Sequence, residues 1–254
     1  MRGTFSRIWS SAVVTARTLP LFSNRATVIV SFLLAPHMQI ALSVLFGASL
    51  NSPSILRTAY AGALAGVAAT ICTCVGMAIT MAKMQGTLVE VTTYRQVDTA
   101  YWLGILLPAA VASLGTGLVT MTAIWCFEPS HGTAALLRAI TLLPAALCAG
   151  IALALVTSGI GVLMSDSLMA LNLVLLLLPV ATGVVVPISM YPIGVRAVVK
   201  LLPLSSVVTA VSDDASAWAV LGAELLRCFI LGLVWLLTLR IFARRIRQGA
   251  LIDG

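Results

Sequence analysis

Long runs without a charged residue constrain this chain more than any other feature of its sequence. Five runs contain no Asp, Glu, Lys or Arg: 26–56, 58–82, 99–127, 139–165 and 167–195. Each exceeds the roughly 18 apolar residues that a helix needs to cross the hydrocarbon core of a bilayer. Hydrophobic residues make up 60% of the chain and charged residues only 9%, unlike the composition of soluble domains. These runs predict an all-α membrane protein.

A sixth run, 221–242, carries Glu224 and Arg227 near its start. We interpret it as a full span whose first turns lie at the membrane interface, where Arg227 reaches water and pairs with Glu224 three residues earlier. The alternative is a short helix that lies on the interface. The expected fold is a single transmembrane domain over 1–254, with six spans near 27–50, 59–82, 101–127, 139–164, 167–187 and 220–242.

Basic residues predict the orientation of these spans. Six spans place both termini on one side, and that side carries ten Lys or Arg residues against five on the other. The ten are Arg2, Arg7, Arg17, Arg25, Lys83, Arg95, Arg240, Arg244, Arg245 and Arg247, and the five are Arg57, Arg138, Arg196, Lys200 and Arg227. The positive-inside rule therefore places both termini in the cytoplasm. The basic residues are expected to attract membrane lipids, and no nucleic acid is expected as a partner.

Residues 1–25 predict an amphipathic helix at the cytoplasmic interface. Arg7 and Arg17 interrupt the apolar residues, unlike the continuous core of a secretory signal. The apolar residues recur at steps of three and four: Phe5, Ile8, Trp9, Ala12, Val13, Ala16 and Leu19. Pro20 is expected to end the helix. The helix either anchors the chain among lipid headgroups or contacts a partner subunit.

The sequence lacks the residues of several well-known sites. A phosphate-binding loop needs Gly-Lys followed by Ser or Thr, whereas the two lysines, Lys83 and Lys200, follow Ala and Val. The two histidines, His37 and His131, form no H-E-x-x-H pair. We therefore expect neither a metal nor a cofactor in this chain, and we do not interpret it as an enzyme.

Two connections between the spans carry distinctive residues. The segment 83–98 follows the second span and begins Lys-Met-Gln-Gly-Thr-Leu-Val-Glu. The second connection follows the fifth span, where Gly183, Pro187, Pro192 and Pro203 interrupt apolar sequence. Pro and Gly free backbone groups that lipid cannot satisfy, so this piece is expected within protein or at a water-filled cavity. It predicts a broken, re-entrant external segment between spans five and six.

On these two connections the chain resembles a permease subunit of the type 2 ATP-binding-cassette (ABC) exporters. That family has a Gly-Thr-Leu-Glu element after the second span, and Gly86, Thr87 and Leu88 match its first three positions. It also has Gly-x-x-x-Pro-x-x-x-x-Pro at the end of the fifth span, followed by Pro-Leu; the matching residues are Gly183, Pro187, Pro192, Pro203 and Leu204. The resemblance extends over the whole chain, from the amphipathic N-terminus to the basic tail.

The first element departs from the family pattern. Val89 stands where the family has Glu, Glu90 follows one position later, and a proline that is common further along is missing. The resemblance implies that Gly86, Thr87, Leu88 and Glu90 couple the chain to an ATPase, with 83–98 as the cytoplasmic coupling segment. The alternative is an ordinary capped loop between two helices.

The second element implies an external gate formed by Gly183, Pro187, Pro192 and Pro203. The alternative is a rigid re-entrant plug that seals the bundle. His37 and Gln39 are candidates for the substrate pathway, because an ionisable group at membrane depth indicates a functional site by default. Pro36 is expected to kink the helix there. The alternative for His37 is a neutral imidazole bonded to a backbone carbonyl that the kink frees.

The resemblance implies an ATP-driven exporter in the plasma membrane of a bacterium. Two permease chains, identical or homologous, would combine with two ATPase subunits that bind ATP and Mg²⁺. The substrate would be a hydrophobic or amphipathic drug, antibiotic, lipid or peptide, as in multidrug efflux and antibiotic resistance. The alternatives are an ion-coupled secondary transporter, for which Asp166 is the nearest available carboxylate, and a structural membrane protein without a transport role.

Overall fold

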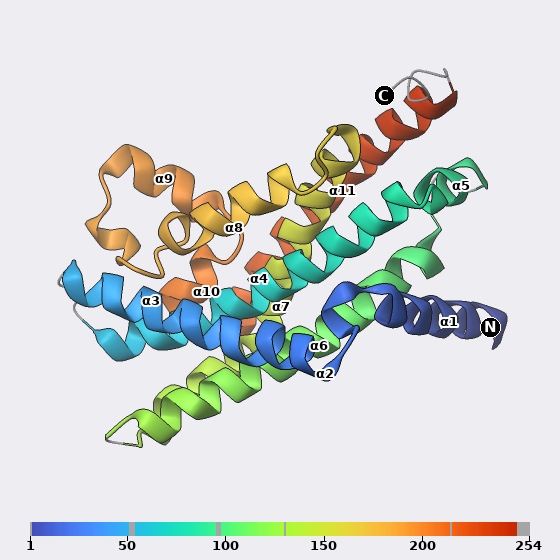
Figure 1. The fold of residues 1–254 in the computed structure, drawn as a ribbon. Coiled ribbons are helices and arrows are strands. Elements are labelled where there is room, and N and C mark those ends of the chain that lie inside the picture. The colour runs from blue at the N-terminus through green and yellow to red at the C-terminus, as the bar shows by residue number, and fades with distance from the viewer. Residues whose placement is uncertain (1, 51–53, 95–97, 130, 214, 248–254) are drawn as a thin grey trace.

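The structure is a computed structural model that describes residues 2–50, 54–94, 98–129, 131–213 and 215–247. Every regular element in these ranges is a helix. In chain order they are α1 (Arg2–Thr18), η1 (Pro20–Phe22), α2 (Arg25–Ile29), η2 (Val30–Leu34), α3 (Ala35–Ser49), α4 (Ile55–Met84), α5 (Thr87–Tyr94), α6 (Thr99–Phe127), α7 (Thr133–Leu163), α8 (Met169–Ala181), η3 (Ile188–Met190), α9 (Ile193–Leu201), α10 (Ser205–Ala210) and α11 (Ala217–Arg247). Figure 1 shows them as one elongated bundle.

Among the described residues, five helices are long and apolar enough to cross a bilayer: Arg25–Ser49, Ile55–Met84, Thr99–Phe127, Thr133–Leu163 and Ala217–Arg244. They coincide with five of the six predicted spans, and the chain has the character of an all-α, membrane-embedded protein. The first of them joins α2, η2 and α3 into one rod. The last has 28 residues, so the alternative of a short interfacial helix for this segment is wrong.

The predicted span 167–187 has a different form. Its helix, α8, has 13 residues, which is about 20 Å and less than the roughly 30 Å of hydrocarbon. The helix ends at Ala181, and Gly183 has a left-handed φ of +79°. A left-handed glycine just after a helix is a usual way of ending it. One helix over the whole of 167–187 is therefore not observed.

The centre of the bundle is α4, which is covered by α3, α6, α7 and α8. In the apolar 18-residue stretch of this helix, 89% of the residues are buried, because small side chains let the neighbouring helices come close. A Cβ on Gly150 of α7 would lie 2.7 Å from Ala68 Cα of α4, so this crossing depends on glycine. On its other side α7 packs along α11, and a Cβ on Gly159 would clash with the Thr238 hydroxyl.

A π-helical turn, η2, precedes Pro36 in the first span. The N–H of Ala35 donates to the carbonyl of Val30, five residues earlier. Proline has no N–H and its ring crowds the carbonyl four residues before it, and the wider π turn accommodates both effects. The helix therefore accommodates Pro36 with a π turn, and the kink expected there stays a prediction.

Helix α1 packs against the start of α6. Arg7 Nη2 lies 2.5 Å from Oδ2 of Asp98, and Asp98 is the N-cap residue of α6. Nearby, Gly104 leaves room for Ser11 of α1, because a Cβ on Gly104 would clash with Ser11 Cβ. The helix ends at Thr18 and Pro20 begins η1, as predicted. Trp9 stays 59% exposed, so α1 has one face on protein and another that is uncovered.

The two ends of the bundle carry different elements (Figure 1). Helices α1 and α5 lie at one end together with the last turns of α11, and we refer to this as the α5 end. Helix α9 and the start of α4 lie at the other end, the α9 end. The first residues of α1 and the last described residues of α11 thus lie at the same end.

Candidate functional site

The segment that follows α8 is attached to the centre of the bundle by Arg57 of α4. Arg57 is only 8% exposed, and its Nη2 donates to the Gly183 carbonyl at 3.1 Å. Gly183 is required there twice over: its φ is positive, and a Cβ would lie 2.5 Å from Ile188 Cγ1. The carbonyl of the predicted gate glycine is therefore hydrogen-bonded to a residue 126 positions earlier in the chain.

Pro187 and Pro192 each stand immediately before a helix. Pro187 precedes η3 and Pro192 precedes α9, where the missing N–H of proline leaves no helical bond unmade. The Pro192 carbonyl accepts the first bond of α9, from the N–H of Arg196, at 2.9 Å. The turn between the two helices is bonded back to α8, because the Tyr191 hydroxyl donates to the Val180 carbonyl at 2.5 Å.

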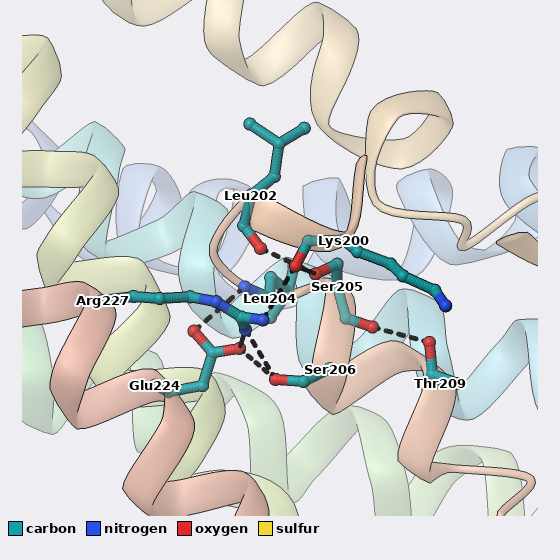
Figure 2. A network of polar contacts seen from close by, with 8 residues as sticks. All are labelled: Lys200, Leu202, Leu204, Ser205, Ser206, Thr209, Glu224 and Arg227. Carbon is teal, nitrogen blue, oxygen red and sulfur yellow. Dashed lines mark hydrogen bonds and ion pairs between the residues drawn. The ribbon is translucent and has the colours of Figure 1, made fainter. Parts of the chain in front are cut away.

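The turn after Pro203 is stabilised by a carboxylate from α11. Leu204 has a left-handed φ of +74°, and its side chain is fully buried. Its N–H donates to Glu224 Oε2 at 3.3 Å. The other carboxylate oxygen accepts from the Ser206 hydroxyl and from Arg227 Nη1, the latter at 2.5 Å. Figure 2 shows the Glu224 carboxylate bonded to Leu204, Ser206 and Arg227.

Arg227 extends this network to α9. Its Nη1 also donates to Ser206 Oγ at 2.8 Å, and its Nη2 donates to the Lys200 carbonyl at 2.8 Å. The predicted Glu224–Arg227 pair is thus confirmed. The expected position of the pair at the membrane interface is not confirmed, because Glu224 is 0% exposed. The sequence signal was a carboxylate and a guanidinium three residues apart in an apolar helix, which also fits a buried pair.

Two helices therefore bond the segment that carries the four predicted gate residues, one at its start and one near its end. Arg57 of α4 bonds the segment at Gly183, and Glu224 and Arg227 of α11 bond it at Leu204 and Lys200. Sequence analysis did not identify Arg57 as a site residue. The signal available for it was a single Arg between two uncharged runs, where a basic residue would pass for an interfacial anchor.

His37 and Gln39 do not share a site. The His37 imidazole Nδ1 bonds the Leu33 carbonyl at 2.6 Å, so the expected contact between the imidazole and a backbone carbonyl is observed. His37 lines an apolar cavity of about 600 Å³ between α3, α4 and α6. Gln39 lines a separate cavity of about 220 Å³ together with Phe32 and Cys74. Residues two apart on a helix point to nearly opposite faces, which is why the two side chains line different cavities in the single chain.

Half of the predicted coupling segment 83–98 is the short helix α5, Thr87–Tyr94. Gly86 has a left-handed φ of +74°, with open space around its Cα, and turns the chain out of α4. The Thr87 hydroxyl donates to the Ala82 carbonyl at 3.0 Å and stabilises this turn. Glu90 is exposed, whereas Leu88 is fully buried against α4 and neighbouring residues. Residues 95–97 of the predicted segment lie outside the described residues.

The residues predicted to couple the chain to an ATPase differ in burial: some side chains are exposed and one is buried. Thr87 and Glu90 have exposed side chains that a partner could contact. Leu88 packs in the same cluster as Leu19 and Phe242, so it joins α5 to the helices at this end. The alternative of a simple capped loop does not describe the segment, since eight residues are helical.

The chain matches no protein-family model, no curated protein and no solved structure with which it was compared.

Proposed function

We propose that this chain is the permease subunit of an ATP-driven exporter similar to the type 2 ABC exporters. One observation supports this most: a single helix, α4, connects the two motif segments. Arg57 near its start bonds Gly183, and Gly86 follows directly after its end. The helix has 30 residues, or about 45 Å, enough to reach from one face of a bilayer to the other.

In this proposal a separate ATPase subunit binds ATP and Mg²⁺ and presses on α5 and α1 at the α5 end. Thr87 and Glu90 offer exposed polar groups for that contact. The packing of Leu88 on α4 would pass the displacement to the long helix. The far end of α4 would then move the segment that Arg57 holds, and ATP would bias the bundle between two states.

The segment 183–204 serves as the external gate in this mechanism. Helix α8 and the residues after it would together make the fifth of the six crossings, with the proline-bounded turns as a re-entrant piece. Such irregular backbone is tolerated at membrane depth only where protein or a cavity surrounds it. Both termini would lie in the cytoplasm of a bacterium, and the α9 end would face outward.

The working unit would contain two permease chains and two ATPase subunits in the plasma membrane. Apolar cavities of the kind lined by His37 suit a hydrophobic or amphipathic substrate such as a drug, an antibiotic, a lipid or a peptide. The apolar surfaces of α3 and α11 are largely exposed in the single chain, which leaves room for a second permease.

One observation favours a second candidate, an ion-coupled secondary transporter. Glu224 is a fully buried carboxylate inside a span-like helix, and such groups often mark ion pathways. Its bond to Arg227 weakens this case, because a paired carboxylate is already neutralised.

The decisive experiment is purification of the tagged chain from its native membrane, followed by mass spectrometry of the intact complex and transport in sealed vesicles. The proposal predicts bound ATPase subunits and efflux of an amphipathic dye that requires ATP hydrolysis. Vesicles that hold the chain alone and transport the dye on a proton or sodium gradient would support the secondary transporter instead. A complex without an ATPase, with no ATP-dependent flux, overturns the exporter.

A further inference from the structure

A cavity of about 450 Å³ opens beside Arg57, between the start of α4 and the segment 187–190. Apolar groups of Leu56, Ala135, Pro187, Met190 and Val211 form much of its wall. The polar residues on the wall are Arg57 and Tyr60, one turn apart on α4, and the serines Ser54, Ser189 and Ser212. Its volume lies in the range of pockets that hold small ligands.

Two buried donors at this cavity have no hydrogen-bond partner among the described residues. Arg57 is 8% exposed, and its Nη2 donates to the Gly183 carbonyl. Its Nη1 has no hydrogen-bond partner in the part of the chain that the structure describes. Tyr60 is 1% exposed, and its hydroxyl is likewise unbonded. A buried donor without an acceptor costs free energy, so an acceptor bound in the cavity would stabilise both groups.

The charge of Arg57 sets the class of that acceptor. Asp213 acts on the guanidinium electrostatically, but the two groups form no ion pair within the described ranges, and Asp213 lines a neighbouring cavity. A guanidinium presents parallel N–H groups that match carboxylate and phosphate oxygens. The apolar wall next to it suits a hydrocarbon group attached to such an anion.

We propose that Arg57 and Tyr60 form a binding site for the anionic group of an amphiphile, with its apolar part against Leu56, Met190 and Val211. The anion is a phosphate or a carboxylate. It comes either from a phospholipid of the surrounding bilayer or, resting on the proposed function, from an acidic amphiphile in transit. Occupation would bridge α4 and the segment after α8, because the same guanidinium bonds Gly183.

The test uses the full chain in phosphatidylcholine nanodiscs, with octyl phosphate as the probe and octanol as its uncharged counterpart. Wild type is expected to bind octyl phosphate and to show no saturable binding of octanol. Arg57→Gln should weaken octyl phosphate binding about tenfold or more, since it removes a charged donor, and Tyr60→Phe about fivefold. The control is Arg244→Gln, which removes the same charge from an exposed residue near the α5 end and should bind like wild type.

A second set of discs, containing phosphatidylglycerol, distinguishes the two sources. If the lipid is the natural occupant, native mass spectrometry will find it retained by wild type and lost in Arg57→Gln, and octyl phosphate will bind more weakly in these discs. If an acidic amphiphile is the occupant, octyl phosphate will bind equally in both sets. Either result supports the site. Equal octyl phosphate binding and equal lipid retention by wild type and Arg57→Gln overturn it.

Tyr60→Phe decides the matter if Arg57→Gln does not fold, because it removes only a hydroxyl: full octyl phosphate affinity and unchanged lipid retention in that variant would then overturn the site. Binding needs no ATPase, so it is separable from transport. A chain that binds octyl phosphate but lacks ATP-driven flux would refute the exporter and leave the site intact.

Discussion

Glu224 in α11 accepts a hydrogen bond from the backbone N–H of Leu204 at 3.3 Å, so a fully buried carboxylate holds a left-handed turn that lies twenty residues earlier in the chain. The same carboxylate pairs with Arg227. Buried charges are stable only when their neighbours satisfy them, and here the neighbours are the Leu204 N–H, Ser206 of α10 and Arg227 of α11. The turn after Pro203 and the start of α11 are therefore expected to form or fail together.

Glu224→Ala should lower the free energy of unfolding by about 3 kcal/mol, because it leaves Arg227 and the Leu204 N–H without their acceptor. Glu224→Gln should cost less, since an amide oxygen still accepts from Leu204. Thermal unfolding of the purified protein measures both. Glu90→Ala is the control, because Glu90 is exposed and its loss should change stability by less than about 0.5 kcal/mol. A Glu224→Ala protein as stable as wild type would contradict the network.

Gly183→Ala should destabilise the protein more than Gly86→Ala. Both glycines have positive φ values, of +79° and +74°, which cost an alanine about 1 kcal/mol. Only Gly183 has a neighbour in the way, since a Cβ there would lie 2.5 Å from Ile188 Cγ1, whereas the space at Gly86 is open. Melting temperatures of the two variants give the comparison. Equal losses would mean that the segment after α8 shifts freely.

Gly150→Ala should separate α4 from α7. The added methyl would lie 2.7 Å from Ala68 Cα, and overpacking of this kind costs about 1–3 kcal/mol. Gly115→Ala is its matched control, because Gly115 also lies within a long helix but has nothing within 4 Å of the added carbon. That control should be neutral or up to about 1 kcal/mol more stable, since alanine favours helix. The prediction fails if both substitutions have the same effect on thermal unfolding.

Leu88→Ala and Glu90→Ala should differ in which property they change. Leu88 is fully buried, so its truncation should cost about 2–5 kcal/mol of stability. Glu90 is exposed at the same helix, so its loss should leave stability intact and reduce ATP-dependent transport if the proposed coupling is correct. Unfolding curves and vesicle flux, measured on the same preparations, separate the two. Wild-type flux in Glu90→Ala would remove this residue from the coupling surface.

Much of the helical framework could be predicted because lipid imposes a simple rule on sequence. A segment that lacks charged side chains over about 20 residues satisfies its own backbone groups as a helix. Five of the six predicted spans are long helices with ends close to those expected. The end of α1 before Pro20 also followed from local chemistry, since proline lacks an N–H.

The predicted span 167–187 shows that a long uncharged run does not always form one long helix. Apolar residues continue past Ala181, so composition alone could not show that α8 ends there. The left-handed Gly183 ends the helix because Arg57, far away in sequence, bonds its carbonyl and Ile188 occupies the space a side chain would need. Such contacts depend on which helices become neighbours, which hydropathy does not encode.

The sequence by itself determined the membrane helices, the pairing of Glu224 with Arg227 and the two segments that carry proline and glycine. Only the tertiary structure decided that Glu224 is buried, that Arg57 reaches Gly183, that Leu88 faces inward and that His37 and Gln39 line different cavities. The reason is physical. Helix formation in lipid depends on local backbone satisfaction, whereas burial and hydrogen-bond partners depend on how the finished helices pack.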